Sequence, residues 1–454
     1  MNYQDFIKSK SQYSDMSGFD PLWLPDFLFD FQRHLLEWSI RKGRAAIFAD
    51  CGLGKTPMQL VWAENVVRKT NGRVLILTPI AVGAQTVKEA EKFGVEATRS
   101  RDGKFSESSK IIVTNYEQLE KFTPSDFVGC VCDESQIFKN FNGKTKEQAI
   151  EFMRMLPYRL LCSATPSPND FVELGNSSES LGELGFQDMA TRFFVKETKK
   201  DYLGWGRNSY RLRTHAEKGF WQWVCSWARA IRRPSDLGYC DRNFNLPSLI
   251  TNEHEVKTSK PAPGRLFDVP AENLHEQREE QRRTIVERCE KAAELCNRDE
   301  PSVLWCYLND EGDLLEELVK GAKQVSGSDS DEEKEETFLA FSSGQLKKLV
   351  VKPKIGALGM NWQHCNHMTF FPSHSFEQIY QGTRRCWRFG QKNDVTADMI
   401  VTEGGAKVFA SYNRKAEQAE RMFAMLIENM NESLQIQATQ YGTTNMESPL
   451  WARK

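Results

Sequence analysis

The segment Ala-Asp-Cys-Gly-Leu-Gly-Lys-Thr at 49–56 combines the residue types that bind a polyphosphate. It directly follows the apolar run 45–48, which is typical of a buried strand. The two glycines allow a tight loop whose backbone N–H groups face phosphate oxygens, and a following helix adds the positive end of its dipole. Lys55 can reach the β and γ phosphates, and the Thr56 hydroxyl is a ligand for Mg²⁺. This order of strand, loop and helix predicts a nucleotide-phosphate site.

An acidic pair, Asp133 and Glu134, follows the apolar run 128–132. Beside a phosphate loop, Asp133 would hold Mg²⁺ through water, and Glu134 would orient and deprotonate the attacking water. An acidic pair after a strand is by itself more often a helix cap. Together with the phosphate loop, the pair favours a role in hydrolysis.

Two arginines far downstream, Arg385 and Arg388, are three residues apart within the segment 381–391. At that spacing, one face of a helix can present both side chains to the same anion. An isolated pair of this kind usually lies on a solvated helix surface. The phosphate loop and the acidic pair favour the interpretation that these arginines bind phosphate.

Two sets of short apolar runs would position these residues. The first set is 45–48, 74–77, 111–113, 128–132 and 159–162, and the second is 302–305, 348–351, 368–371 and 397–401. Nearly continuous apolar runs with long spacers are typical of parallel strands joined by crossover helices. We therefore expect an α/β protein with two tandem doubly wound parallel-sheet lobes, a helical insertion and a C-terminal helix.

The expected domain boundaries follow from these patterns. They are an N-terminal extension at 1–23, lobe 1 at 24–175, a helical insertion and interlobe linker at 176–300, lobe 2 at 301–404, a C-terminal helix at 405–440 and a flexible tail at 441–454. A length of 454 residues is consistent with about three domains, or two with an insertion.

Composition excludes several classes of protein. With 40% hydrophobic and 27% charged residues, the chain is neither collagen-like nor broadly disordered. A net charge of -2 excludes a polycationic nucleic-acid coat but not a local basic groove. We expect no transmembrane helix and no secretion signal, and the 11 scattered cysteines are typical of a reducing cytoplasm.

The motifs in this order resemble superfamily 2 helicases, most closely the Swi/Snf-type ATPases, over roughly 28–403. The matching segments are Phe31-Gln32, the phosphate loop, Ile76-Leu77-Thr78-Pro79 (motif Ia), Val113 to Glu117 (Ib), Asp133 to Gln136 (II), Ser163 to Pro166 (III), Arg232-Arg233-Pro234 with Leu246-Pro247, Val303 to Leu308 (IV), Lys354 to Trp362 (V) and Gln381 to Gln391 (VI). One such motif is weak, but many in order are specific. The compactness resembles bacterial or bacteriophage DEAD/DEAH-box-like helicases, without the large insertions of chromatin remodellers.

The resemblance implies RecA-like lobes that hydrolyse ATP with Mg²⁺ while moving on nucleic acid. It assigns catalysis to Lys55, Asp133, Glu134, Arg385 and Arg388, nucleotide binding to Gln32, Gly52, Gly54, Lys55, Thr56, Gly359 and Gln381, and Mg²⁺ to Thr56 and Asp133. Nucleic-acid contacts fall on Thr78, Pro79, Thr114, Asn115 and Asn361, and coupling falls on Ser163, Thr165 and Gln136. Asp50-Cys51 stands where the family usually has Glu-Met, and Ser135-Gln136 replaces Ala-His, so coupling is altered in detail.

We expect a monomeric, cytoplasmic DNA helicase or translocase, in a bacterial cell or a phage-infected host, that favours duplex or forked DNA whatever its sequence. The alternatives are an RNA helicase, and a nucleotide-gated scaffold or motor subunit for a nuclease or methyltransferase. Two other patterns are assigned to structure. The helical stripe of Phe220, Trp223, Val224, Trp227 and Ile231 is expected to be core rather than a base-stacking platform, and His364, Cys365, His367 and His374 are not expected to bind a metal.

Overall fold

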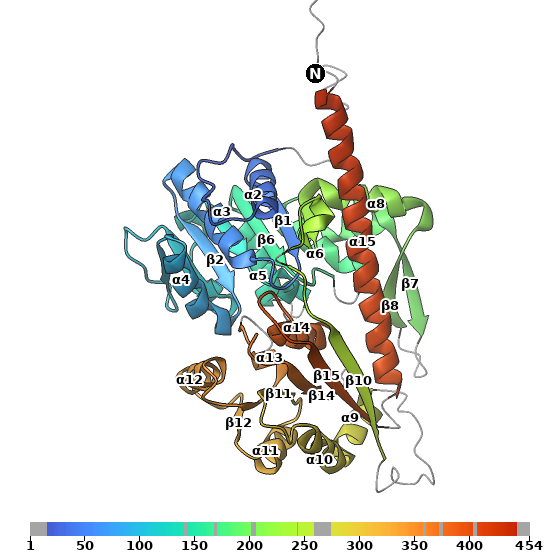
Figure 1. Cartoon of the computed structure of the whole chain (residues 1–454). Coiled ribbons are helices and arrows are strands. Elements are labelled where there is room, and N and C mark those ends of the chain that lie inside the picture. The colour runs from blue at the N-terminus through green and yellow to red at the C-terminus, as the bar shows by residue number, and fades with distance from the viewer. Residues whose placement is uncertain are drawn as a thin grey trace, which may run out of the picture.

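Two parallel β-sheets, each flanked by helices, form two lobes stacked one above the other (Figure 1). The structure is a computed structural model that describes residues 16–139, 144–167, 170–200, 206–242, 244–257, 274–356, 360–371, 376–402 and 406–442. The expected α/β class with two tandem RecA-like sheets is confirmed. Each predicted strand lies within one or two residues of an observed one, because fully buried parallel strands are the easiest to recognise in a sequence.

Lobe 1 contains a sheet of seven parallel strands. Their spatial order is β3 (Ala97–Arg99), β4 (Ile111–Asn115), β2 (Val74–Thr78), β5 (Gly129–Cys132), β6 (Tyr158–Ser163), β1 (Arg44–Ala49) and β9 (Ala228–Ile231). The helices of this lobe are α2 (Asp30–Lys42), α3 (Lys55–Thr70), α4 (Gly83–Lys92) and α5 (Lys144–Arg154). The carboxyl ends of β1, β5 and β6 are therefore neighbours, and each leads into one of the predicted motifs.

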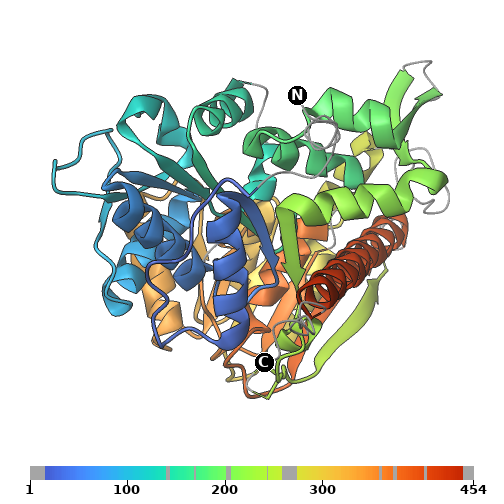
Figure 2. The same ribbon diagram turned by 90° about the horizontal axis from the view of Figure 1, so that it is seen from above.

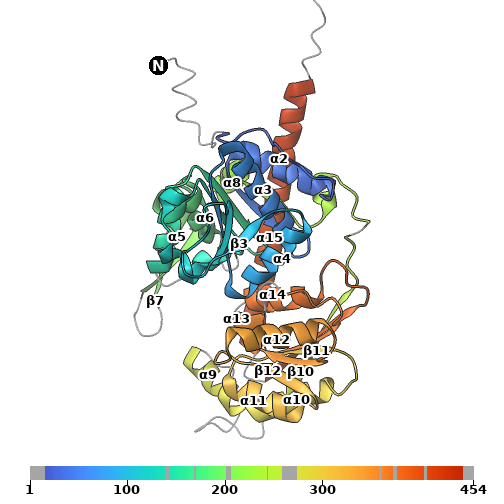
Figure 3. The same cartoon turned by 90° about the vertical axis from the view of Figure 1, so that its left-hand side faces the viewer.

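Lobe 2 contains a sheet of six parallel strands. Their spatial order is β10 (Leu249–Val256), β15 (Val395–Thr402), β14 (His367–Phe370), β11 (Ser302–Trp305), β13 (Lys348–Val351) and β12 (Ala322–Val325). The helices are α9 (Leu274–Arg283), α10 (Ile285–Leu295), α11 (Asn309–Leu318), α12 (Asp331–Ser342), α13 (Pro353–Gly356) and α14 (Phe376–Cys386). Figure 3 shows α14 at the level where the two lobes meet.

The segment between the lobes differs from the expected insertion at 176–300. Its first part is a subdomain on lobe 1, made of α6 (Leu174–Leu181), α7 (Phe186–Phe193), the antiparallel pair β7 (Phe194–Lys200) and β8 (Gly206–Leu212), and α8 (Glu217–Trp227). Its second part belongs to the sheets, because β9 pairs with β1 and β10 pairs with β15. Neither strand is a clean apolar run, since β9 contains an arginine and β10 is a largely polar edge strand. Neither strand could therefore be predicted from the apolar pattern of the sequence.

The long C-terminal helix α15 (Ala406–Gly442) begins after the last strand of lobe 2 and returns along lobe 1 (Figures 1 and 2). The Sγ of Cys225 in α8 donates to the carbonyl oxygen of Leu426, and Arg421 pairs with Glu217 at 2.7 Å. Leu426 and its buried neighbours on α15 belong to the core cluster of lobe 1. The helix therefore links the end of lobe 2 to the subdomain of lobe 1.

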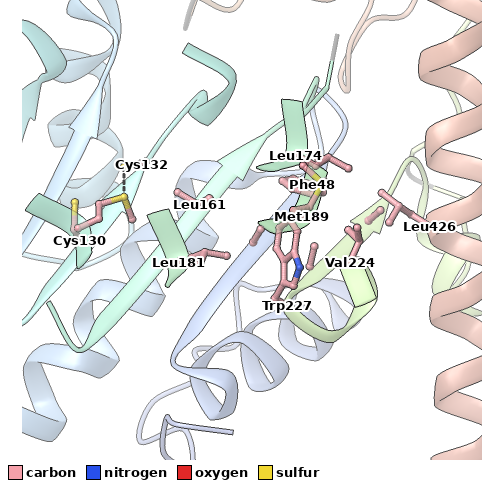
Figure 4. Packing of buried hydrophobic residues seen from close by; sticks show 14 of the residues in the cluster. Phe48, Cys130, Cys132, Leu161, Leu174, Leu181, Met189, Val224, Trp227 and Leu426 are labelled. Carbon is pink, nitrogen blue, oxygen red and sulfur yellow. Dashed lines mark hydrogen bonds between the residues drawn. The ribbon is translucent and has the colours of Figure 1, made fainter. Parts of the chain in front are cut away.

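The predicted stripe is core, although only its first four members lie on α8, since Ile231 ends β9. Trp227 is fully buried and meets the ring of Phe48 in β1 edge to face, with ring centroids 6.2 Å apart. Figure 4 shows Trp227 between Phe48, Met189 and Val224, with Leu426 of α15 close by. Because these side chains come from α7, α8, α15 and the central sheet, one cluster holds the subdomain and the C-terminal helix on lobe 1.

None of the helices in the described part of the chain combines the length and apolar character needed to span a bilayer.

Candidate active site

The phosphate loop connects β1 to α3 and has the backbone that a phosphate cradle requires. Gly52 and Gly54 have φ values of 89° and 75°, a left-handed conformation that glycine adopts most readily. A Cβ at Gly54 would lie 2.3 Å from Nε2 of Gln32, so a larger residue there would displace the Gln32 side chain. The Gln32 amide itself donates to the Leu53 carbonyl at 2.9 Å and accepts from the Phe29 N–H at 3.0 Å. The Gln32 side chain therefore connects the start of α2 to the phosphate loop.

Lys55 is the first residue of α3, and Thr56 is the second. The Nζ atom of Lys55 donates to the Ala49 carbonyl at 3.1 Å. Burial alone would lower the pKa of Lys55, but negative charge at Cys51, Glu134, Asp133 and Asp50 outweighs burial and raises it. Lys55 therefore stays charged in the middle of the acidic groups.

Asp133 follows β5 and points at α3. Its Oδ1 accepts from Nε2 of Gln59 at 2.7 Å, and its backbone carbonyl accepts from the Tyr116 hydroxyl. Burial and the neighbouring charge of Glu134 raise the pKa of Asp133 to about 6, against the opposing attraction of Lys55. A buried carboxyl with a raised pKa beside a phosphate loop is typical of a functional site.

Glu134 has a φ of 49°, and Asn71 is the only other non-glycine among the described residues with a positive φ. Such a conformation is strained and often occurs at active sites. The Oε2 of Glu134 accepts from Nε2 of Gln136 at 2.9 Å. The Oε1 of Gln136 accepts from the Ser163 hydroxyl at 2.5 Å. The Ser163 Oγ in turn accepts from the backbone N–H of Thr165 at 2.9 Å. A continuous hydrogen-bonded chain therefore runs from the acidic pair to the loop after β6.

Of the two predicted arginines on lobe 2, Arg388 lies beside the phosphate loop, and both bind within their own lobe. Arg385 and Arg388 each donate an Nη1 hydrogen bond to the Met360 carbonyl at 3.2 Å. Burial and the charge of Arg385 lower the pKa of Arg388 to about 10. A Cβ at Gly52 would lie 3.7 Å from the Cβ of Arg388, which places Arg388 next to the loop. Within lobe 2, Arg385 also donates to the Gln381 carbonyl, and the Gln381 side chain is buried.

These residues fit Mg²⁺ and ATP. The loop turns at Gly52 and Gly54 into the N-terminus of α3, and the charges of Asp133 and Glu134 act on the half-buried Lys55. Thr56 and Asp133 would hold the metal, and Lys55 would hold the phosphates. Bound Mg²⁺ would neutralise charge on the phosphate oxygens during hydrolysis.

The predicted nucleic-acid residues are placed in part. Thr78 and Asn115 end neighbouring strands and stand opposite each other in the β2–β4 register. Pro79 and Thr114 are buried beside them, and Asn115 donates to the Glu117 carboxylate at 3.1 Å. Asn361 is half-buried on lobe 2, whereas Gly359 lies outside the described residues. The structure therefore brings Thr78, Pro79, Thr114 and Asn115 together at the carboxyl ends of β2 and β4.

The segment that contains His364, Cys365 and His367 does not form a metal cluster within the described residues. Two of its members, Cys365 and His367, are buried in lobe 2, where His367 pairs with Asp398 at 2.9 Å. His374 lies outside the described residues.

Sequence reasoning missed four residues that organise the site, namely Asp50, Gln59, Tyr380 and Arg384. Gln59 could have been found from its position, because it follows Lys55 by one helical turn and so faces the same side of α3. Asp50, Tyr380 and Arg384 bind one another across the two lobes. Their sequence separation leaves no local signal of that contact.

No protein-family model matches the chain, and no curated protein matches it at a significant level. Solved structures do match. Saccharomyces cerevisiae Dbp5 bound to RNA and ADP BeF3 is 12% identical, with a TM-score of 0.55, and the match covers 87% of this chain and 93% of that chain. The Sulfolobus solfataricus SWI2/SNF2 ATPase core in complex with dsDNA is 15% identical, with a TM-score of 0.42, and the match covers 85% of this chain and 90% of that chain. The match with Dbp5 covers most of both chains, so it shows that the two share a fold, here one of two tandem RecA-like lobes.

Proposed function

We propose that the protein is a nucleic-acid-dependent ATPase that moves along or unwinds DNA. The observation that carries the proposal is the hydrogen-bonded chain from Glu134 through Gln136 to Ser163 and Thr165. It connects Glu134, whose backbone is strained and which lies beside a phosphate loop, to a second loop at the carboxyl ends of the same sheet. Such a connection lets a change at the nucleotide alter the surface of the lobe.

In this proposal, each residue of the site has a separate task. Lys55 binds the outer phosphates, Asp133 and Thr56 hold Mg²⁺, and Glu134 accepts a proton from the attacking water. Arg388 lies beside the loop and would stabilise charge on the transferred phosphoryl group, a contribution of roughly 10³ to 10⁵ in rate. Arg385 shares the Met360 carbonyl with Arg388 and would support the same charge.

Nucleic acid would bind across both lobes. Asn115 and Asn361 are half-buried and would contact phosphates through their amide groups, whereas the Thr78 and Thr114 hydroxyls are buried beneath that surface. Contacts to phosphates make binding depend little on sequence and strongly on salt. The glutamine form of motif VI, which begins at Gln381, resembles the DNA-acting branch and favours duplex or forked DNA. Of the two structural neighbours, one is complexed with dsDNA and the other with RNA, so RNA is kept as the alternative partner.

A nucleotide-gated scaffold for a nuclease or methyltransferase is the other alternative. It would have no need of Glu134, whose strained backbone and buried partners are consistent with catalysis. We also propose that the chain acts as a monomer in the cytoplasm. All eleven cysteines are free and lie in the described part of the chain, which is consistent with a reducing compartment.

The test is steady-state ATP hydrolysis by the wild type with no nucleic acid, single-stranded DNA, duplex DNA, forked DNA and RNA, over a series of salt concentrations. We expect slow hydrolysis alone, strong stimulation by duplex-containing DNA, and a steep loss of stimulation as salt rises. Lys55→Ala is the control for contaminating activity and should be inactive throughout.

Different outcomes select different functions. Stimulation by RNA alone would favour the RNA helicase, and tight ATP binding without turnover would favour the scaffold. A hydrolysis rate that no nucleic acid changes would contradict the proposal.

A further inference from the structure

Arg384 lies on α14 between the phosphate-loop face and the interlobe linker, next to the two arginines already described. Its guanidinium packs on the ring of Trp387 at 4.3 Å and faces the ring of Tyr380 at 5.2 Å. The Trp387 indole N–H donates to the Pro247 carbonyl of the linker at 2.7 Å. Arg384 is therefore held by two aromatic rings, one of which is fixed to the linker.

The charged end of Arg384 crosses to lobe 1. Its Nη2 donates to Oδ2 of Asp50, the second residue of the phosphate loop, and the Tyr380 hydroxyl donates to Oδ1 of the same carboxylate. Both members of the ion pair are buried, with 8% of Arg384 and 6% of Asp50 exposed. Burial alone would lower the pKa of Arg384, but the Asp50 carboxylate outweighs burial and raises it, so the guanidinium stays charged. This is a buried ion pair between the lobes.

Asp50 is itself fixed within lobe 1. Its Oδ1 accepts from the Cys51 N–H at 2.6 Å, and its own backbone N–H donates to the Ile231 carbonyl of β9 at 3.0 Å. The carboxylate therefore shapes the first turn of the phosphate loop at the same time as it binds α14. Any movement of α14 relative to the loop must break or carry along these bonds.

The segment after α14 is in close contact with the phosphate loop. A Cβ at Gly52 would lie 2.9 Å from the backbone nitrogen of Phe389 and 3.7 Å from the Cβ of Arg388. Arg388 lies two residues beyond Cys386, the last residue of α14, and four residues after Arg384. The position of Arg388 at the loop thus depends on where the Asp50–Arg384 pair holds α14.

We propose that Arg384 is a positioning residue for ATP hydrolysis: its ion pair with Asp50 docks α14 on the phosphate loop and thereby seats Arg388 beside the reacting phosphate. The inference rests on the proposed function, since it concerns the rate of that reaction. It differs from the expectation for Arg385 and Arg388, because Arg384 acts through a carboxylate of lobe 1 and not on the nucleotide.

The test is a double-mutant cycle on the full chain with Asp50→Asn, Arg384→Gln and the double variant, each assayed for kcat and for the KM of ATP. A misplaced catalytic group lowers the rate strongly, so each single variant should lose roughly tenfold to a hundredfold in kcat. KM should change much less than kcat. The double variant should be no slower than the slower single variant, because both changes remove one interaction.

Two further variants cover a failure to fold. Arg384→Lys keeps the charge but has a single ammonium in place of the planar guanidinium, so it should recover part of the kcat that Arg384→Gln loses. Tyr380→Phe keeps the ring and removes only the hydroxyl that donates to Asp50, so it should lower kcat less than Arg384→Gln does. Arg421→Gln is the matched control, since it breaks an exposed ion pair with Glu217 between α15 and α8 and should leave kcat unchanged.

Hydrogen exchange of the peptides that cover 49–56 and 384–391 separates this proposal from the proposed function. If the wild type does not hydrolyse ATP with any nucleic acid, the proposed function fails. Docking is still tested, because Arg384→Gln should lose amide protection in both peptides and Arg421→Gln should not. Equal protection in wild type and Arg384→Gln would overturn the docking role.

The kinetic results can also overturn the proposal. Losses that multiply in the double variant would show that Arg384 acts independently of Asp50, for example on the phosphates. An unchanged kcat with a lowered melting temperature would show that the pair only stabilises the fold.

Discussion

Two polar networks, each centred on a buried carboxylate and one in each lobe, are satisfied to different degrees. In lobe 2, the Asp398 carboxylate accepts from Asn252 at 2.8 Å and from His254 and His367 at 2.9 Å, and His367 also pairs with Ser302 at 3.0 Å. In lobe 1, Glu134 has a strained backbone, and the hydroxyls of Ser135 and Thr165 are buried without a hydrogen-bond partner in the described part of the chain.

The two networks also lie at different places in their sheets. The lobe 2 network begins at the first residues of β11 and β14, whereas the lobe 1 network follows the last residues of β5 and β6. In open α/β sheets, ligands bind outside the carboxyl ends of the strands. Location and incomplete satisfaction thus distinguish a site for chemistry from a network that holds a sheet together.

The largest expected effect is on turnover, in Glu134→Gln. Loss of the general base should lower kcat by roughly 10² to 10⁴ while ATP binding persists, because only proton acceptance is removed. Parallel measurements of steady-state hydrolysis and nucleotide binding check this. Near wild-type hydrolysis would show that the acidic pair is misassigned.

The next largest effect is on folding, in Trp227→Ala. Removing this buried ring should lower the free energy of unfolding by roughly 3–5 kcal/mol, because it leaves a cavity between α8, β1 and α15. Thermal denaturation measures the loss. A variant as stable as wild type but weaker in DNA binding would instead make the aromatic stripe a base-stacking surface.

A smaller loss of stability is expected in Asp398→Asn. Two histidines would lose their charged acceptor, at a cost of roughly 1–3 kcal/mol, with little change in kcat per folded molecule. Burial alone would raise the pKa of Asp398, but hydrogen bonds from His367, His254 and Asn252 hold it below its usual range. The loss of stability of Asp398→Asn relative to wild type should therefore be complete above about pH 4 and should shrink as the pH falls further. Chemical denaturation of both proteins between pH 3 and pH 7, at roughly unit intervals, would test this window.

The smallest effect concerns coupling, in Ser163→Ala. The change removes the hydroxyl that connects Gln136 to the Thr165 N–H, a loss of roughly 0.5–1.5 kcal/mol. We expect the ratio of DNA-stimulated to basal hydrolysis to fall several-fold, with basal hydrolysis nearly intact. Equal losses in both rates would mean that Ser163 supports catalysis and not coupling.

Much of the fold could be predicted because its central strands contain short, nearly continuous apolar runs. The strands that escaped prediction are edges or interrupted runs, such as β3, β12 and β10, whose half-buried or exposed side chains weaken the apolar signal. The glycine-rich loop and the acidic pair could be located because their chemistry is carried by adjacent residues. The positive φ of Glu134 is a tertiary property and has no signal in the sequence.

The interlobe contact could not be predicted for a different reason. Asp50 and Arg384 are 334 residues apart, and their pairing depends on how two separately folded sheets dock. The sequence pointed to Arg385 and Arg388 from their spacing, from the phosphate loop and the acidic pair, and from the resemblance of 381–391 to motif VI. The expected common helix face is not formed, because α14 ends at Cys386, and none of these signals tells which arginine reaches the other lobe.

The most direct test of the account compares two matched carboxylate-to-amide variants, Glu134→Gln and Asp398→Asn, in both hydrolysis and thermal unfolding. The account predicts opposite results, with Glu134→Gln losing DNA-stimulated turnover at a nearly wild-type melting temperature and Asp398→Asn losing stability at a nearly wild-type kcat. A Glu134→Gln variant that turns over ATP normally, or an Asp398→Asn variant that is stable but inactive, would contradict the assignment of chemistry to lobe 1 and structural support to the lobe 2 network.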